Sequence, residues 1–126
     1  MSKDILSLDL DPFPNPRMTH ADRWQKRTSV LRFRANRDQL YYTAFAQGYI
    51  PAHKLIMEFD LPMPPSWSDK KRKEHLGKPH QQTPDIDNLV KAILDSLFED
   101  DKKVHLLLAL KRWSEKGRIT IKNWRE

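Results

Sequence analysis

The sequence contains no cysteine, only three glycines and no long apolar run. Without cysteine the chain can form neither disulfides nor a thiol nucleophile, and it cannot build the common cysteine-based zinc sites. Its longest apolar stretch, residues 106–110, is too short to cross a bilayer, and the first residues lack the apolar core of a secretory signal. These absences predict a protein of the cytoplasm that has no membrane partner.

Positive charge is what the sequence has in excess. Lysine and arginine number 23 against 17 acidic residues, which gives a net charge of +6. A basic protein of this kind attracts polyanions, of which nucleic acid is the commonest. The 126 residues suffice for one domain with a modest core, and we predict a single domain over residues 1–126.

The apolar pattern predicts two main helices and about four strands. A helix begins at Thr28 or Ser29 and stops at Gly48, and a second helix covers residues 87–97. Strands are predicted at residues 5–10, 54–61, 103–111 and 118–124, the last two joined by a turn at 114–117. This order predicts an α+β fold in which a mixed sheet packs against the two helices.

Between these elements, residues 62–84 contain five prolines and a basic run, with at most one short helix between Ser68 and Gly77. A connection of this length is usually functional or disordered, so we predict a flexible basic loop. Its charges, together with basic residues near the N-terminus and a histidine close to the acidic segment, are the predicted DNA contacts: Arg17, Arg23, Lys70, Lys71, Arg72, Lys73, Lys78 and His80. A solvated loop without a partner is the alternative.

Negative charge gathers in one segment. "PDIDNLVKAILDSLFEDD", residues 84–101, holds six carboxylates and one lysine. Its apolar residues repeat at helical spacing and predict a buried stripe. If the helix begins at Asp87 after an extended entry from Pro84, the side chains of Asp85 and Asp87 converge at the helix start. A second acidic group that includes Asp100 and Asp101 follows the helix.

Two interpretations of the first acidic pair remain open. Carboxylates held close together repel one another unless a cation neutralises them, and Mg²⁺ prefers oxygen ligands and often binds substrate phosphate as well. Lys91, one turn after Asp87, could then stabilise charge that develops on a scissile phosphate, while the ion acidifies the attacking water. Alternatively, the aspartates only cap the helix, and Lys91 forms a surface ion pair within it.

Longer motifs resemble the RusA family of Holliday junction resolvases. "PDIDNLVKAILDSLFEDDKKV" resembles the family signature, "PRMTHADRWQKR" and "MPPSWSDKKRKEHLGKPHQQTPDIDNL" are similar to its phage and prophage branch, and "KRWSEKGRITI" looks like its closing hairpin. The resemblance covers most of the chain. It implies a Mg²⁺-dependent endonuclease that cuts four-way DNA junctions in recombination and repair.

The resemblance also implies roles for individual residues. The metal-binding aspartates of the family fall on Asp85, Asp87 and Asp101, its catalytic lysine on Lys91, and the neighbouring acid on Asp100. The chain departs from the family in one respect: relatives often carry extra residues between the helix and the acidic pair, whereas here Leu97 runs almost directly into "FEDD".

Family members are homodimers, and a twofold dimer suits a reaction that needs two symmetric cuts. Apolar side chains on both faces of "VHLLLAL" make this strand a candidate for core packing on one side and a dimer contact on the other. Two other functions stay open: a nuclease of the same fold acting on flaps or replication forks, and a non-catalytic basic DNA-binding domain.

Overall fold

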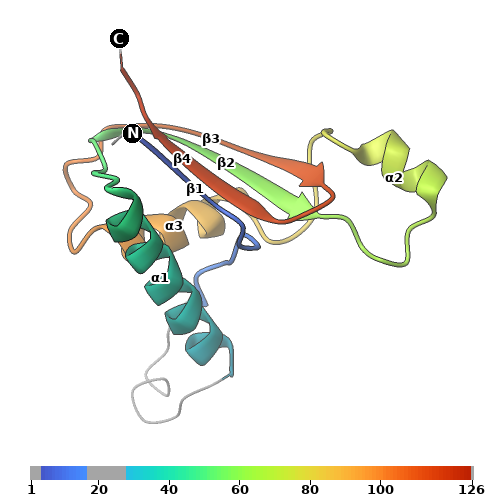
Figure 1. Cartoon of the computed structure of the whole chain (residues 1–126), viewed down its shortest axis with the longest axis horizontal. Coiled ribbons are helices and arrows are strands. Elements are labelled where there is room, and N and C mark those ends of the chain that lie inside the picture. The colour runs from blue at the N-terminus through green and yellow to red at the C-terminus, as the bar shows by residue number, and fades with distance from the viewer. Residues whose placement is uncertain (1–3, 17–27, 126) are drawn as a thin grey trace.

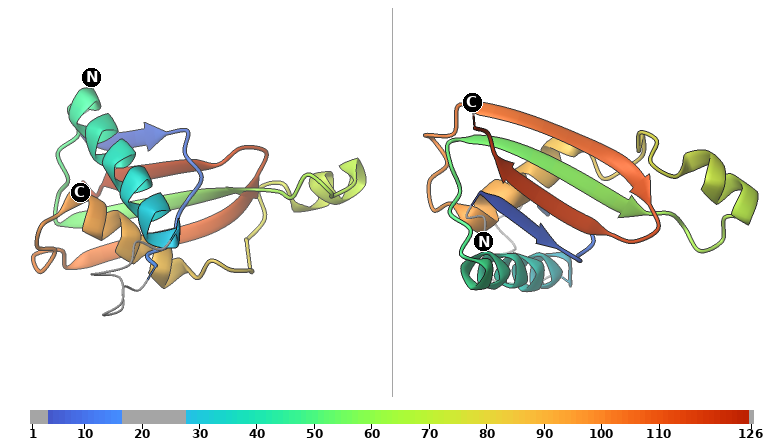
Figure 2. Two further views of the ribbon diagram at one scale, coloured as in Figure 1. Left: turned by 90° about the horizontal axis from the view of Figure 1, so that it is seen from below. Right: turned by 45° about the horizontal axis from the view of Figure 1, so that its top comes forward.

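A four-stranded mixed sheet forms one layer of the protein, and two helices cover one of its faces (Figures 1 and 2). The computed structural model describes residues 4–16 and 28–125. The elements follow the order β1 (Ile5–Leu8), α1 (Thr28–Gln47), β2 (Lys54–Pro62), α2 (Asp69–His75), α3 (Ile86–Leu97), β3 (Leu106–Ser114) and β4 (Arg118–Asn123). The predicted α+β class, with two main helices and a mixed sheet, is confirmed. None of the described helices has the length and apolarity that a membrane span requires.

The strands lie in the order β1-β4-β2-β3. β2 pairs in parallel with β3, from Lys54 opposite Leu106 to Pro62 opposite Ser114, and antiparallel with β4. β1 completes the sheet by antiparallel pairing with β4. β3 is therefore an edge strand that points the same way as β2.

The core lies between the sheet and the two main helices. Along β2 every second residue is buried, and the buried set includes Met57 and Phe59. From α3, Leu89 and Ile93 reach the same cluster, as the helical spacing predicts. α1 ends at Gln47, and the next residue, Gly48, has a φ of 69°, a conformation that glycine adopts without strain.

The last two strands do not form the hairpin that the sequence suggests. β2 lies between β3 and β4, so the turn after β3 carries the chain across the end of β2. β4 therefore lies between β1 and β2, and its residues Ile119 and Ile121 are completely buried. β3 also begins at Leu106, later than predicted, because a turn closed by the bond from the Val104 amide to the Asp101 carbonyl precedes it.

Residues 63–80 form an arm that carries α2 away from the sheet (Figure 1). Ser68 caps α2 by accepting a hydrogen bond from the Lys71 amide, which confirms the short helix expected in this segment. At the base of the arm, Trp67 packs on Trp113 of β3, with ring centroids 4.8 Å apart. The returning chain then runs along the end of β3, where Pro79 forms a bridge with Arg112.

Candidate active site

The segment that links the arm to α3 carries the first acidic pair, and we call residues 81–87 the acidic turn. Asp85 and Asp87 are exposed and line one open depression of about 700 Å³ together with Lys111 from β3. Both aspartates thus border one depression at the start of α3, and their convergence on a single point stays a prediction. α3 itself begins at Ile86, with Asp85 as the residue before it.

Asp85 occupies the capping position of α3 without using its side chain as a cap. Its backbone is extended, with φ −69° and ψ 147°, and no hydrogen bond joins its carboxylate to the helix. The Asp87 carboxylate accepts one hydrogen bond, from the neighbouring Asn88 amide at 2.9 Å. Most of the oxygen lone pairs of this pair are thus unused by the described structure, and such hard oxygen donors fit the ligand preference of Mg²⁺.

The second acidic group lies at the other end of α3. Twelve helical residues at a rise of 1.5 Å put about 18 Å between the two ends of the helix. Asp100 and Asp101 follow the helix directly and are exposed, and Asp100 pairs with Lys102 at 3.5 Å. Among residues 4–16 and 28–125, no group of three or more histidine or acidic side chains is placed to hold one metal. The four predicted ligands therefore do not converge within one chain.

Lys91 forms an ion pair toward the C-terminal end of α3. Its Nζ lies 3.5 Å from Oδ2 of Asp95, and Nδ2 of Asn15 donates to that same oxygen at 2.6 Å. Asn15 is largely buried and comes from the proline-rich segment after β1. The sequence did not single out Asn15, whereas a surface ion pair of Lys91 within the helix was one of the two alternatives that it left open, and the structure contains this pair.

Lys111 is the other residue at this site that the sequence interpretation missed. Its ammonium donates to the carbonyls of Gln82 at 2.7 Å and Pro84 at 2.9 Å, and so reaches the acidic turn from β3. Lys111 aligns with Phe59 in the parallel register and thus points to the face of the sheet that holds the core. The sequence feature that could have revealed Lys111 is a charged residue at a position of the predicted strand that faces the core.

The predicted basic contacts of the arm divide into two kinds. Arg72 is used within the structure, because its guanidinium donates to the Pro64 carbonyl and to Glu115, each at 2.9 Å. Lys71 lies over the ring of Trp67, 4.4 Å from its centroid. The remaining lysines of this group are exposed and form no ion pair within the described ranges: Lys70, Lys73 and Lys78.

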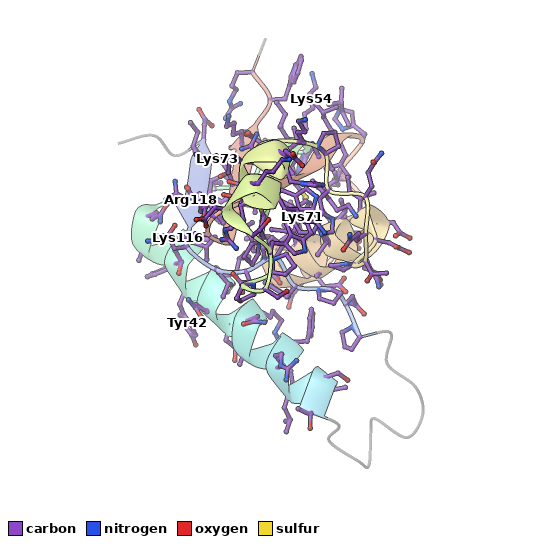
Figure 3. The ribbon with its side chains drawn as sticks, turned by 90° about the vertical axis from the view of Figure 1, so that its right-hand side faces the viewer. Tyr42, Lys54, Lys71, Lys73, Lys116 and Arg118 are labelled. Atoms are coloured by element: carbon purple, nitrogen blue, oxygen red, sulfur yellow. The ribbon has the colours of Figure 1, made fainter. Side chains whose placement is uncertain are left out.

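More positive charge lies at the same end of the molecule. Figure 3 looks onto the end from which the arm projects and labels Lys71 and Lys73 together with Lys116 and Arg118, which flank the start of β4. Arg118 pairs with Asp9 at 2.9 Å. The arm and the β3–β4 turn therefore present a basic surface at the end of the sheet toward which β2 and β3 run.

His80 differs from the other predicted DNA contacts that the structure describes because it is buried. The His80 ring is 5% exposed and packs on Trp113, with centroids 4.2 Å apart. Burial lowers the pKa of this imidazole, and the nearby Lys111 ammonium lowers it further. A direct contact with DNA would require the ring to leave this packing. Arg17 and Arg23 lie outside the described residues.

A basic surface at the same end of the sheet as the acidic turn fits a protein that binds nucleic acid. The family model described as "Endodeoxyribonuclease RusA" matches residues 10–122 of the chain. The chain therefore belongs to the RusA family, and this membership makes it an endodeoxyribonuclease. A search of curated proteins finds no match.

The unused carboxylate of Asp85 leads to a prediction about stability. Removing an aspartate that caps a helix usually costs about 1 kcal/mol. Because Asp85 makes no capping hydrogen bond, we expect Asp85→Ala to change the free energy of unfolding by less than about 0.5 kcal/mol. Urea denaturation measures this change, and Leu89→Ala, which should cost about 2–5 kcal/mol, verifies that the assay detects damage to α3. A loss of 1 kcal/mol or more at Asp85 would identify it as a structural cap.

Proposed function

We propose that the protein is a Mg²⁺-dependent, structure-selective endonuclease that resolves four-way DNA junctions by paired symmetric cuts. Family membership supports an endodeoxyribonuclease that acts in Holliday junction resolution. The observation that carries the metal dependence is the exposed Asp85–Asp87 pair on one depression, whose carboxylates accept a single hydrogen bond among the described residues. We further propose that the protein works in the cytoplasm of a bacterial or phage-infected cell, on the nucleoid.

In this proposal the chain's own residues do three things. Asp85 and Asp87 supply oxygen ligands, and the bound ion would contribute charge neutralisation at the scissile phosphate and an acidified water. Lys91 stabilises negative charge that develops on the phosphate, and Asp95 together with Asn15 orients the lysine. Exposed lysines of the arm bind phosphates of the junction arms without reading bases.

The separation of the acidic groups leads to the proposal of a homodimer. One chain offers two aspartates at each end of α3, which are too far apart to share an ion. The start of β3 follows Asp101, whereas its far end reaches the acidic turn through Lys111. A twofold axis near the middle of β3 would set two copies of this strand antiparallel. The acidic turn of one copy would then lie beside Asp100 and Asp101 of the second copy.

β3 has the surface that such a contact needs. The returning arm covers the edge of β3 near Trp113, where the Gly77 amide donates to the Trp113 carbonyl at 2.9 Å. No strand of the described sheet covers the outer edge at residues 106–110. Leu106 and Leu108, on the face away from the helices, are 40% and 54% exposed. An open apolar strand edge is a site where a second chain pairs, so this part of β3 is our proposed dimer contact.

A complementation experiment tests the shared site. We expect Asp85→Asn/Asp87→Asn and Asp100→Asn/Asp101→Asn to abolish cleavage of a four-way junction in Mg²⁺ while junction binding survives, because an amide is a poor Mg²⁺ ligand and carries no charge. Mixing the two inactive proteins should restore cutting of one strand per junction. In the mixed dimer one site unites the intact acidic turn of one copy with the intact acidic pair of the other.

The outcome separates two architectures. If each chain holds a complete site, the mixture stays inactive, since each copy carries a defect in its own site. If all the asparagine variants cut at the wild-type rate, the metal site lies elsewhere. The control compares two samples of the same mixture. One is pre-incubated long enough for subunits to exchange between dimers, and the other is assayed before exchange.

The arm generates a second test. Replacing Lys70, Lys73 and Lys78 with glutamine should weaken junction binding and reduce the slope of log affinity against log salt by up to about 0.9 per lost phosphate contact. Arg72 is left in place because it holds the arm to the body. Lys122→Gln on β4 is the control, since Lys122 is paired with Glu58 on the sheet. An unchanged slope in the triple variant would mean that the arm does not touch DNA.

A further inference from the structure

Lys111 is a half-buried cation whose bonds go to backbone carbonyls and not to a carboxylate. Within the described ranges it forms no ion pair, and its ammonium is engaged by the carbonyls of Gln82 and Pro84. Hydrogen bonds from a charged donor are stronger than bonds between neutral groups, because the charge adds to the attraction. A half-buried lysine held in this way fixes the shape of the turn that it contacts.

The Pro84 carbonyl belongs to the peptide bond that leads into Asp85. Holding this oxygen at 2.9 Å fixes the plane of that peptide and hence the direction in which the Asp85 side chain leaves the backbone. Among the residues that the structure describes, no side-chain bond orients the Asp85 carboxylate, and the Asp85 carbonyl accepts a hydrogen bond from the Leu89 amide at 3.2 Å. Lys111 thus restrains the backbone on the N-terminal side of Asp85, and helix α3 restrains it on the C-terminal side.

This restraint is the last of a series that joins the returning arm to β3. The Gly77 amide donates to Trp113, the Trp113 amide donates to Lys78, and the His80 amide donates to the Lys111 carbonyl at 3.1 Å. The Lys111 ammonium then extends the attachment beyond the last backbone bond, to the acidic turn. The chain from the arm to the aspartates is therefore fastened to one strand along its length.

We propose that Lys111 is a positioning residue that holds the acidic turn in the conformation from which Asp85 and Asp87 act. The role of this turn in cleavage rests on the function proposed above. The contact between Lys111 and the acidic turn does not depend on that function. Lys111 also lines the same depression as the two aspartates, and a positive charge there would offset repulsion between their carboxylates in the absence of metal.

Three substitutions test this role through hydrogen exchange and cleavage. In Lys111→Met we expect faster amide exchange over residues 81–88 of the protein without metal or DNA. We also expect a cleavage rate at saturating enzyme that is lower by about tenfold or more, because small misplacements at a reacting centre are costly. Junction affinity should stay within about twofold. Lys111→Arg, whose fork can still donate to two carbonyls, should recover slow exchange and most of the rate.

The control is Lys122→Met, which removes a lysine from the other face of the sheet and should change neither measurement. If Lys111→Met does not fold, Lys111→Gln keeps a polar group at the position and carries the same expectations. Unchanged exchange over residues 81–88 would overturn the proposal, whether or not the rate falls. Faster exchange with an unchanged rate would overturn it as well, because the contact would then be structural only.

The exchange measurement keeps this proposal separate from the proposed function. If the wild-type protein fails to cut junctions in Mg²⁺, the proposed function is wrong, and exchange over residues 81–88 still decides whether Lys111 holds the turn. If the wild type cuts and the Lys111 variants behave as the control does, the function stands and the assignment of Lys111 fails.

Discussion

The parallel pairing of β2 with β3 determines where every functional element of this protein lies. Two parallel neighbours cannot be joined by a tight hairpin, so the chain must return from the end of β2 to the start of β3. The arm, the acidic turn and α3 together make this return (Figure 1). The arm and acidic turn consequently lie at one end of the sheet, and the acidic pair Asp100–Asp101 lies at the other.

This layout answers how a basic protein can use a cluster of negative charge. Three lysines of the arm, Lys70, Lys71 and Lys73, are carried away from the sheet on α2, whereas the first acidic pair stays close to the end of β3, on a depression shared with Lys111. Phosphate can therefore be attracted by one surface while the carboxylates act nearby. The short connection after Leu97 leaves the second acidic pair at the far end of α3, and in our proposal a second copy of the chain compensates for that distance.

The sequence predicted the elements well where side-chain periodicity decides them. The buried stripe of α3, the alternation along β2 and the stop at Gly48 follow from local patterns, and the structure confirms them. The order of the strands did not follow from local patterns. Whether β4 pairs with β3 or with β2 depends on where Ile119 and Ile121 find a core, which is a property of the assembled sheet.

The candidate site was also predictable only where local sequence patterns determine it. The placement of Asp85 and Asp87 at the start of α3 follows from the entry at Pro84 and the helical spacing after it, which are local features. The contacts of Lys111 and of Asn15 span 27 and 80 positions in the sequence, so no local pattern could reveal them. The engagement of Arg72 with Pro64 and Glu115 was hidden likewise, because a run of basic residues does not indicate which of them bind the protein itself.

The decisive experiment for the proposed function is cleavage of a labelled four-way junction beside a duplex of matched sequence, in Mg²⁺ and in EDTA. We expect paired cuts at symmetric positions of the junction in Mg²⁺, no cuts in EDTA and little cutting of the duplex. Binding of the junction without any Mg²⁺-dependent cut would contradict the proposed function and would favour a non-catalytic DNA-binding protein. Cutting of forks or flaps in preference to the junction would retain the nuclease and refute its proposed substrate.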